Sequence, residues 1–154
     1  MTSRIIVTGG AGFIGSNLVK EFLKRDFEVY VFDNLSSGLR ENIPIENPKL
    51  FFFEFDLKLD FKHWPVVKAD KLFHLAANAD VRGGYKDHNI DFRENICVTK
   101  SICDYCVANK IKHLTFASSA TVYGEPSKFP TPENSELKQT SLYGASKLSC
   151  EAII

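Results

Sequence analysis

Short apolar runs alternate along the chain with longer stretches in which apolar residues recur at helical spacing. The apolar runs are bounded by glycine, proline or polar residues, as buried strands are. They predict five strands, over residues 4–8, 28–32, 50–55, 71–75 and 113–117. Helical spacing predicts helices over residues 16–25, 89–109 and a segment at the C-terminal end. Strands that alternate with helices predict an α/β fold with a parallel sheet covered on both faces.

The apolar stripe of the 89–109 helix is predicted to contain Ile90, Ile96, Ile102, Cys106 and Val107. The proline-containing stretch 125–139 is predicted to be a surface loop.

Composition narrows the classes of partner. The 154 residues have a formal net charge of +0 and are 44% hydrophobic, which gives no electrostatic reason to expect a nucleic-acid or membrane partner. No leader precedes the first strand and no apolar run is long enough to span a bilayer, so we expect a cytoplasmic protein. Cys103 and Cys106 form a C-x-x-C inside the predicted helix. Buried thiols are favoured over a redox or metal site, and no metal is expected.

A glycine-rich turn joins the first strand to the first helix. Its glycines fit G-x-G-x-x-G as Gly10, Gly12 and Gly15, and they also fit a three-residue spacing as Gly9, Gly12 and Gly15. Either pattern lets the backbone approach a pyrophosphate, whose charge is favoured at a helix N-terminus.

Asp33 ends the second strand, about 20 residues after these glycines, where a ribose-binding acid is expected. A carboxylate there accepts hydrogen bonds from the ribose diol and repels a 2′-phosphate, so NAD is predicted rather than NADP. The alternative is a solvated turn residue. Arg40 is the nearest downstream cation and could also contact the cofactor.

Seven stretches in order along nearly the whole chain carry a family resemblance. They are residues 8–15, 33–38, 56–57, 74–81, Asn95 with Thr99, residues 118–124 and residues 143–147. With them the chain resembles the extended short-chain dehydrogenase/reductases, and within these the nucleotide-sugar epimerases similar to UDP-glucose 4-epimerase. The resemblance implies a Rossmann-type, doubly wound parallel sheet that stops after about five strands. It also implies a single, incomplete NAD-binding domain over residues 1–154.

The resemblance implies further contacts with NAD. Phe13 and Ile14 would offer backbone N–H groups to the pyrophosphate, and Asp56 and Leu57 would contact the adenine. The adenosine ribose would lie along Asn34, Ser36, Ser37 and Gly38. The nicotinamide side would be lined by Leu75, Ala76, Ala77 and Asn78. Asn95 is placed beside the cofactor site, chiefly to fix backbone geometry between two strands, and His74 is expected to be a core strand residue.

Tyr143 and Lys147 stand four residues apart on the terminal helix, one turn from each other. A phenol with a pKa near 10 is a poor base at neutral pH, and a nearby ammonium and a nicotinamide cation lower that pKa. The resemblance implies that Tyr143 takes the proton of a sugar hydroxyl while hydride passes to NAD. Ser119 would orient the reacting oxygen, and Lys147 would also hold the nicotinamide ribose. Return of the hydride to the other face of a 4-keto sugar completes epimerisation.

Ala120 and Thr121 follow Ser119, where dehydratases and decarboxylases of the family typically carry Asp or Glu. Their presence favours epimerisation over elimination, while a reductase or dehydrogenase of the same superfamily stays open. Chains of the family are typically about twice as long, and the half expected to bind a UDP-sugar or other nucleotide-sugar has no counterpart here. An NAD-binding module without catalysis is therefore the alternative. The resemblance also implies a homodimer formed through the 89–109 helix and the terminal helix.

Overall fold

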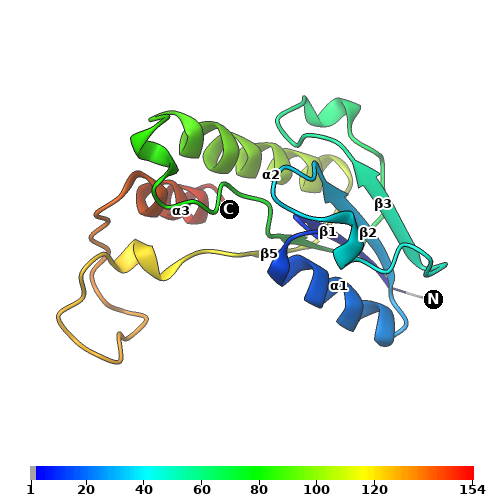
Figure 1. Ribbon diagram of the computed structural model, residues 1–154, viewed down its shortest axis with the longest axis horizontal. Coiled ribbons are helices and arrows are strands. Elements are labelled where there is room, and N and C mark those ends of the chain that lie inside the picture. The colour runs from blue at the N-terminus through cyan, green and yellow to red at the C-terminus, as the bar shows by residue number, and fades with distance from the viewer. Residues whose placement is uncertain (1–2) are drawn as a thin grey trace. The chain divides into compact units, whose positions relative to one another are not determined.

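The computed structural model describes residues 3–154. Its sheet has five parallel strands in the order β3-β2-β1-β4-β5 (Figure 1). The strands are β1 Arg4–Thr8, β2 Glu28–Asp33, β3 Leu50–Glu54, β4 Lys71–His74 and β5 His113–Phe116. The five predicted strands are confirmed to within one residue at each end. Because the strands are parallel, the ends of β1, β2 and β4 meet at one edge of the sheet.

Three α-helices accompany the sheet in the described part of the chain: α1 Phe13–Lys24, α2 Val98–Ala108 and α3 Leu142–Ile153. A π-helix, η4, covers Phe92–Cys97 and leads directly into α2. Short 3-10 turns are η1 Arg40–Asn42, η2 Phe61–His63, η3 Gly83–Tyr85 and η5 Ala120–Tyr123. Helix α1 begins three residues earlier than predicted, because its first turn carries the exposed Phe13 and Ile14, which do not extend the apolar stripe.

The chain divides into two compact units, described separately below. The first contains the residues up to Ala76 together with Ser101–Ala117, and the second contains Ala77–Lys100 and Ser118–Ile154. The expectation that residues 1–154 form one domain stays a prediction.

Helices cover both faces of the sheet in the first unit. Val19 of α1 belongs to one buried cluster with Val7 and Val31 of the central strands. Phe32 follows Val31 and so points to the opposite face, where its ring packs edge-on against Tyr105 of α2, with ring centroids 6.1 Å apart. The doubly wound, Rossmann-type fold class predicted from the sequence is confirmed.

One side of α2 is buried. In α2 the apolar positions Val98, Ile102, Tyr105 and Cys106 are buried, whereas Val107, which was predicted to belong to the apolar stripe, is 80% exposed. Each residue advances a regular helix by about 100°, so Val107 lies about 140° around α2 from Ile102. The prediction for Val107 is therefore wrong, because its spacing takes it off the buried side.

Cys103 and Cys106 lie in α2, and neither is part of a disulfide. Burial raises the pKa of Cys106 to about 11, so this thiol is protonated at neutral pH. Within residues 3–154, no group of three His, Cys, Asp or Glu side chains is arranged to hold a metal ion. No helix in the same range combines the length and apolar character needed to cross a membrane.

The turn into α1 provides a stability test. A Cβ on Gly15 would lie 2.1 Å from the carbonyl oxygen of Gly9, whereas the nearest atom to a Cβ on Gly12 would be 3.3 Å away. We expect Gly15→Ala to lower the free energy of unfolding by about 1–3 kcal/mol despite the better helix propensity of alanine. Urea denaturation would measure this, with Gly12→Ala as the matched control. Equal stability of the two variants would contradict the crowding.

Candidate functional site

The chain leaves β1 through a crowded turn. Gly9 has a φ of +67°, and a Cβ on it would lie 2.7 Å from the backbone nitrogen of Ala76. Its N–H donates to the carbonyl oxygen of Phe32 at 2.9 Å. The hydroxyl of Thr8 accepts from the N–H groups of Leu75 at 3.2 Å and Ala76 at 3.3 Å. The end of β1 is thereby fixed to the ends of both neighbouring strands.

The N-terminus of α1 opens from this turn without a side-chain cap. Gly12 is the N-cap residue, and no side chain caps it and no acidic residue occupies the first turn. Phe13 is 85% exposed and Ile14 is 65% exposed. The first N–H groups of a helix have no partner within the helix, and together with the helix dipole they favour an anion. This turn therefore fits the pyrophosphate of a dinucleotide.

Asp33 lies beside the same turn. One carboxylate oxygen accepts from the backbone N–H of Ala11 at 2.9 Å, and the other accepts from that of Leu35 at 2.8 Å. The side chain is buried, at 7% exposed. Each oxygen keeps a further lone pair that could accept from a ribose hydroxyl. Asp33 is thus more than a solvated turn residue, because it also holds the glycine turn in place.

The remaining predicted cofactor residues of the first unit differ in accessibility. Asn34, Ser36 and Ser37 are exposed, Gly38 is buried, and Asp56, Leu75 and Ala76 are half-buried. Leu57 is 6% exposed, so little of its side chain is open to an adenine ring.

Arg40 and His74, also of the first unit, have partners within the protein. Arg40 lies 3.5 Å from a Glu54 carboxylate oxygen, and its guanidinium carbon is 5.0 Å from the ring centroid of Phe52. His74 is buried, and its Nδ1 is 2.8 Å from the Thr8 hydroxyl, as expected of a core strand residue.

In the second unit, Asn95 lies at the centre of a buried polar network. Its side-chain oxygen accepts from the N–H of Asn78 at 2.8 Å, and its amide nitrogen donates to Ser146 of α3 at 2.9 Å and to Asp91 at 3.2 Å. Ser146 in turn donates to the carbonyl oxygen of Tyr143 at 2.8 Å. Asn95 therefore connects the loop after β4, which also carries Ala77, with helix α3. Its bonds reach a loop and a helix, whereas the sequence suggested two strands.

Tyr143, Lys147 and Ser119 also come together in the second unit. Ser141 caps α3 by accepting from the N–H of Gly144 at 3.0 Å, which starts the helix just before Tyr143. The Lys147 ammonium is 5.8 Å from the centroid of the Tyr143 ring. The hydroxyl of Thr121 donates to that of Ser119 at 2.9 Å, and Ser119 is hydrogen-bonded to Tyr143.

Burial sets the ionisation of the pair. It raises the pKa of Tyr143 above its usual value, while the hydrogen bond from Ser119 lowers this pKa and the charge of Asp91 raises it. Burial lowers the pKa of Lys147, and electrostatic interactions with Cys150 and Asp91 raise it. The Tyr143 phenol is therefore protonated at neutral pH in the chain alone, and a further positive charge is needed to make it a base.

Three residues that support these groups were not identified from the sequence. Thr121 was noted only as a residue that cannot titrate, yet its hydroxyl fixes that of Ser119. Asn42 donates to the carbonyl oxygen of Ala11 in the glycine turn at 2.8 Å. Asp91 precedes Asn95 by four residues in a predicted helix, and this spacing could have paired them.

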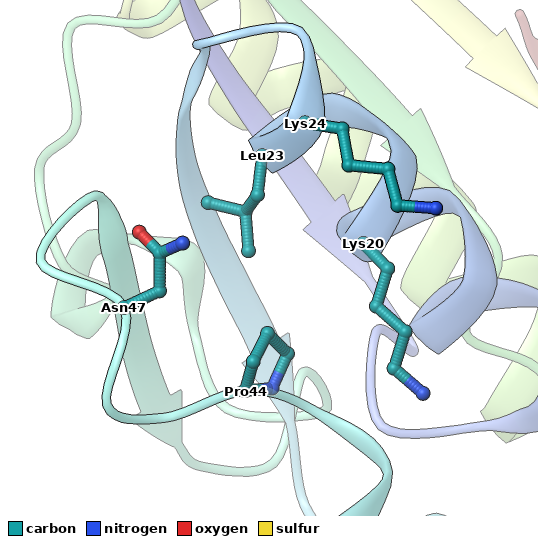
Figure 2. A pocket seen from close by; sticks show the side chains of 5 residues that line it. All are labelled: Lys20, Leu23, Lys24, Pro44 and Asn47. Carbon is teal, nitrogen blue, oxygen red and sulfur yellow. The ribbon is translucent and has the colours of Figure 1, made fainter.

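A pocket of about 260 Å³ lies elsewhere in the first unit, lined by Lys20, Leu23, Lys24, Pro44 and Asn47. Figure 2 shows Leu23 pointing from α1 toward the segment that carries Pro44 and Asn47, with both lysine ammonium groups pointing away from it. None of the predicted site residues lines this pocket.

The chain matches the model of the NAD dependent epimerase/dehydratase family over residues 5–154. It is 35% identical to the UDP-glucose 4-epimerase of Bacillus subtilis (strain 168), an alignment that covers 97% of this chain and 46% of that protein. The structure of Thermus thermophilus UDP-glucose 4-epimerase in complex with NAD is similar with a TM-score of 0.88 and 35% identity, over 97% of this chain and 49% of that one. The Thermotoga maritima UDP-glucose 4-epimerase with UDP-glucose is similar with a TM-score of 0.88 and 34% identity, over 97% and 49%. The chain spans about half the length of the curated relatives that it matches.

The Asn95 network predicts a large effect on stability. Asn95→Ala removes three hydrogen bonds and leaves the N–H of Asn78 without its amide acceptor. We expect the free energy of unfolding to fall by about 2–4 kcal/mol, measured by urea denaturation. Asn109→Ala is the control, because its half-buried amide makes one bond, to the carbonyl oxygen of Tyr105. A loss in Asn95→Ala no larger than in this control would contradict the role of the network.

Proposed function

Because the chain belongs to the NAD dependent epimerase/dehydratase family, we propose that it provides the cofactor-binding and catalytic residues of a nucleotide-sugar 4-epimerase. The proposed reaction interconverts UDP-glucose and UDP-galactose. The relatives named above are UDP-glucose 4-epimerases, and the Thermotoga maritima structure contains UDP-glucose. The observation that carries the proposal is the arrangement of Tyr143, hydrogen-bonded to Ser119 and with the Lys147 ammonium 5.8 Å from its ring centroid.

In this proposal Tyr143 exchanges a proton with the hydroxyl on the sugar carbon that is oxidised and reduced. A bound NAD supplies the acceptor and donor of hydride, and its positive ring also favours the phenolate. Ser119 orients the reacting oxygen together with Tyr143, to which it is hydrogen-bonded while its own oxygen accepts from Thr121. Lys147 is buried, and its ammonium both favours the Tyr143 phenolate and donates to the nicotinamide ribose.

The glycine turn and Asp33 are proposed to hold the pyrophosphate and adenosine ribose of NAD. The open N-terminus of α1 and the carboxylate lone pairs left on Asp33 support this assignment. Ala120 cannot titrate, and the Thr121 hydroxyl is engaged with Ser119, so the segment after Ser119 offers no acid or base for elimination. A reductase or dehydrogenase of the superfamily would use the same three catalytic residues and differ in releasing its product oxidised or reduced.

A second candidate function is an NAD-binding module without catalysis, for which the open N-terminus of α1 and the carboxylate of Asp33 would suffice. Conversion of UDP-galactose to UDP-glucose, measured with catalytic amounts of NAD, distinguishes the candidates. Turnover without net reduction of NAD, by this chain or by a longer product of the same gene, supports the epimerase. NAD binding without turnover in both supports the module. A homodimer formed through the 89–109 helix and α3 stays a prediction for either.

Cofactor choice is predicted to depend on the charge of Asp33. Calorimetric titration of the chain should show tighter binding of NAD than of NADP, because the carboxylate repels a 2′-phosphate. Asp33→Asn keeps an oxygen that can accept a hydrogen bond from a backbone N–H, but it removes the charge. We therefore expect the ratio of the Kd for NADP to the Kd for NAD to fall about tenfold or more. Asp26→Asn, on the exposed end of the α1–β2 turn, is the control. An unchanged NAD/NADP ratio in Asp33→Asn would overturn this assignment.

Catalysis is predicted to depend on the Tyr143 hydroxyl. Tyr143→Phe should reduce kcat for UDP-galactose by about 10²–10⁴-fold, because the proton acceptor is lost, and should leave the Kd for NAD little changed. Tyr123→Phe is the matched control, since the Tyr123 hydroxyl donates only a 3.3 Å bond to the carbonyl oxygen of Glu133. Full activity in Tyr143→Phe would exclude Tyr143 as the base.

A further inference from the structure

Asp91 is a buried carboxylate just before η4, and no motif singles it out. It is 2% exposed. Its Oδ1 accepts from the side-chain amides of Asn78 at 2.9 Å and Asn95 at 3.2 Å. Its Oδ2 is the buried side-chain atom that lacks a hydrogen-bond partner within residues 3–154. A buried ionised carboxylate is costly unless donors or an opposite charge compensate it.

The protein itself closes the space beside Oδ2. A Cβ on Gly84 would lie 3.5 Å from Oδ2 and 3.2 Å from Leu142, so the loop that carries Gly84 covers this side of the carboxylate. Because the oxygen is buried, solvent does not compensate a charge on it.

Lys147 is the buried cation of this unit, at 3% exposed. The charge of Asp91 acts on both members of the catalytic pair, since it raises the pKa of Lys147 and the pKa of Tyr143. Cys150 is the other group that raises the pKa of Lys147, and it is a buried thiol whose own pKa is raised by burial. Asp91 is therefore the buried carboxyl group whose electrostatic effect on this buried ammonium opposes that of burial.

Other charged groups on the neighbouring elements are engaged at the surface or are more exposed. In η4, Arg93 pairs with Asp87, and Glu94 is half-buried. On α3, Glu151 is hydrogen-bonded to Ser118. In η5, Tyr123 is the titratable residue, and Asp80 and Arg82 of the loop after β4 are exposed.

We propose that Asp91 is a positioning residue for the Tyr143–Lys147 pair, an inference that rests on the proposed function. Its carboxylate keeps the buried Lys147 in the ammonium form and, through Asn78 and Asn95, fixes the loop and the helix that surround it. Asp91 acts through Lys147, because its direct effect on Tyr143 disfavours the phenolate. It touches neither of the reacting atoms.

Two variants separate the effect of the Asp91 charge from the effect of its hydrogen bonds. Asp91→Asn removes the charge and keeps an oxygen that can accept from both amides, whereas Asp91→Ala removes both. The control is Asp87→Asn, an exposed carboxylate four residues earlier that pairs with Arg93. Titrations of Tyr143 and Lys147 would be followed by NMR of ¹³C-labelled side chains, without cofactor or substrate.

We expect both titration midpoints to move to lower pH in Asp91→Asn and to stay in place in Asp87→Asn. A purely structural role for Asp91 would leave both midpoints unchanged in the folded Asn variant, and that result overturns the proposal. If Asp91→Asn is too unstable to titrate but still unfolds cooperatively in urea, a double-mutant cycle with Lys147→Met replaces the titration. Lys147→Met should then lose less stability when Asp91 is Asn than when it is Asp, and additive losses would refute the coupling.

These measurements do not require turnover, so they remain decisive if the chain proves not to be an epimerase. In a protein that does turn over UDP-galactose, Asp91→Asn should lower kcat about tenfold and leave KM unchanged. A selective rise in KM would instead assign Asp91 to substrate binding and overturn the positioning role.

Discussion

The arrangement of the first unit depends on close backbone packing at the point where β1 ends. The chain can leave β1 only through a residue without a side chain, because a Cβ at Gly9 would strike the backbone of Ala76. The same packing holds the ends of β1, β2 and β4 at one edge, through the Gly9 N–H and the Thr8 hydroxyl. Asp33 then fixes the turn from the side. Parallel sheets of this kind bind ligands outside the carboxyl ends of their strands, where this rigid turn lies.

The second unit is organised around polar groups. Asn95, Asp91 and Ser146 are all buried, and their side chains use one another and the backbone as partners. Buried polar groups of this kind stabilise a structure only when nearly all are satisfied, and they then specify one arrangement. Helix α3 is held in that arrangement at Ser146, one residue before Lys147. The geometry of the proposed catalytic pair thus depends in part on these hydrogen bonds.

The strands could be predicted because each is a short apolar run bounded by glycine, proline or polar residues. Strands of a parallel sheet are buried on both faces, so they require such apolar runs. The glycine turn and the Tyr143–Lys147 pair could also be predicted. Close approach of the backbone requires glycines, and two residues that share a helix face have to be three or four positions apart. The π-helix was not visible, because an extra residue in a helical turn changes no residue type. The support from Thr121 and Asn42 depends on hydroxyl and amide directions, which no local pattern specifies.

The π-helix Phe92–Cys97 also bears on how this sequence can change. Removing one residue from it would restore regular α-helical hydrogen bonding and, locally, a more stable helix. It would also rotate Asp91, and part or all of the π-segment with it, by about 100° relative to α2, because each residue advances the helix by that angle. The buried network that holds α3 would then lose its partners. A one-residue deletion in this segment would give a more regular helix but would break the hydrogen bonds of the buried network. The proposed catalytic pair on α3 is therefore compatible with the irregular helix and not with the regular one.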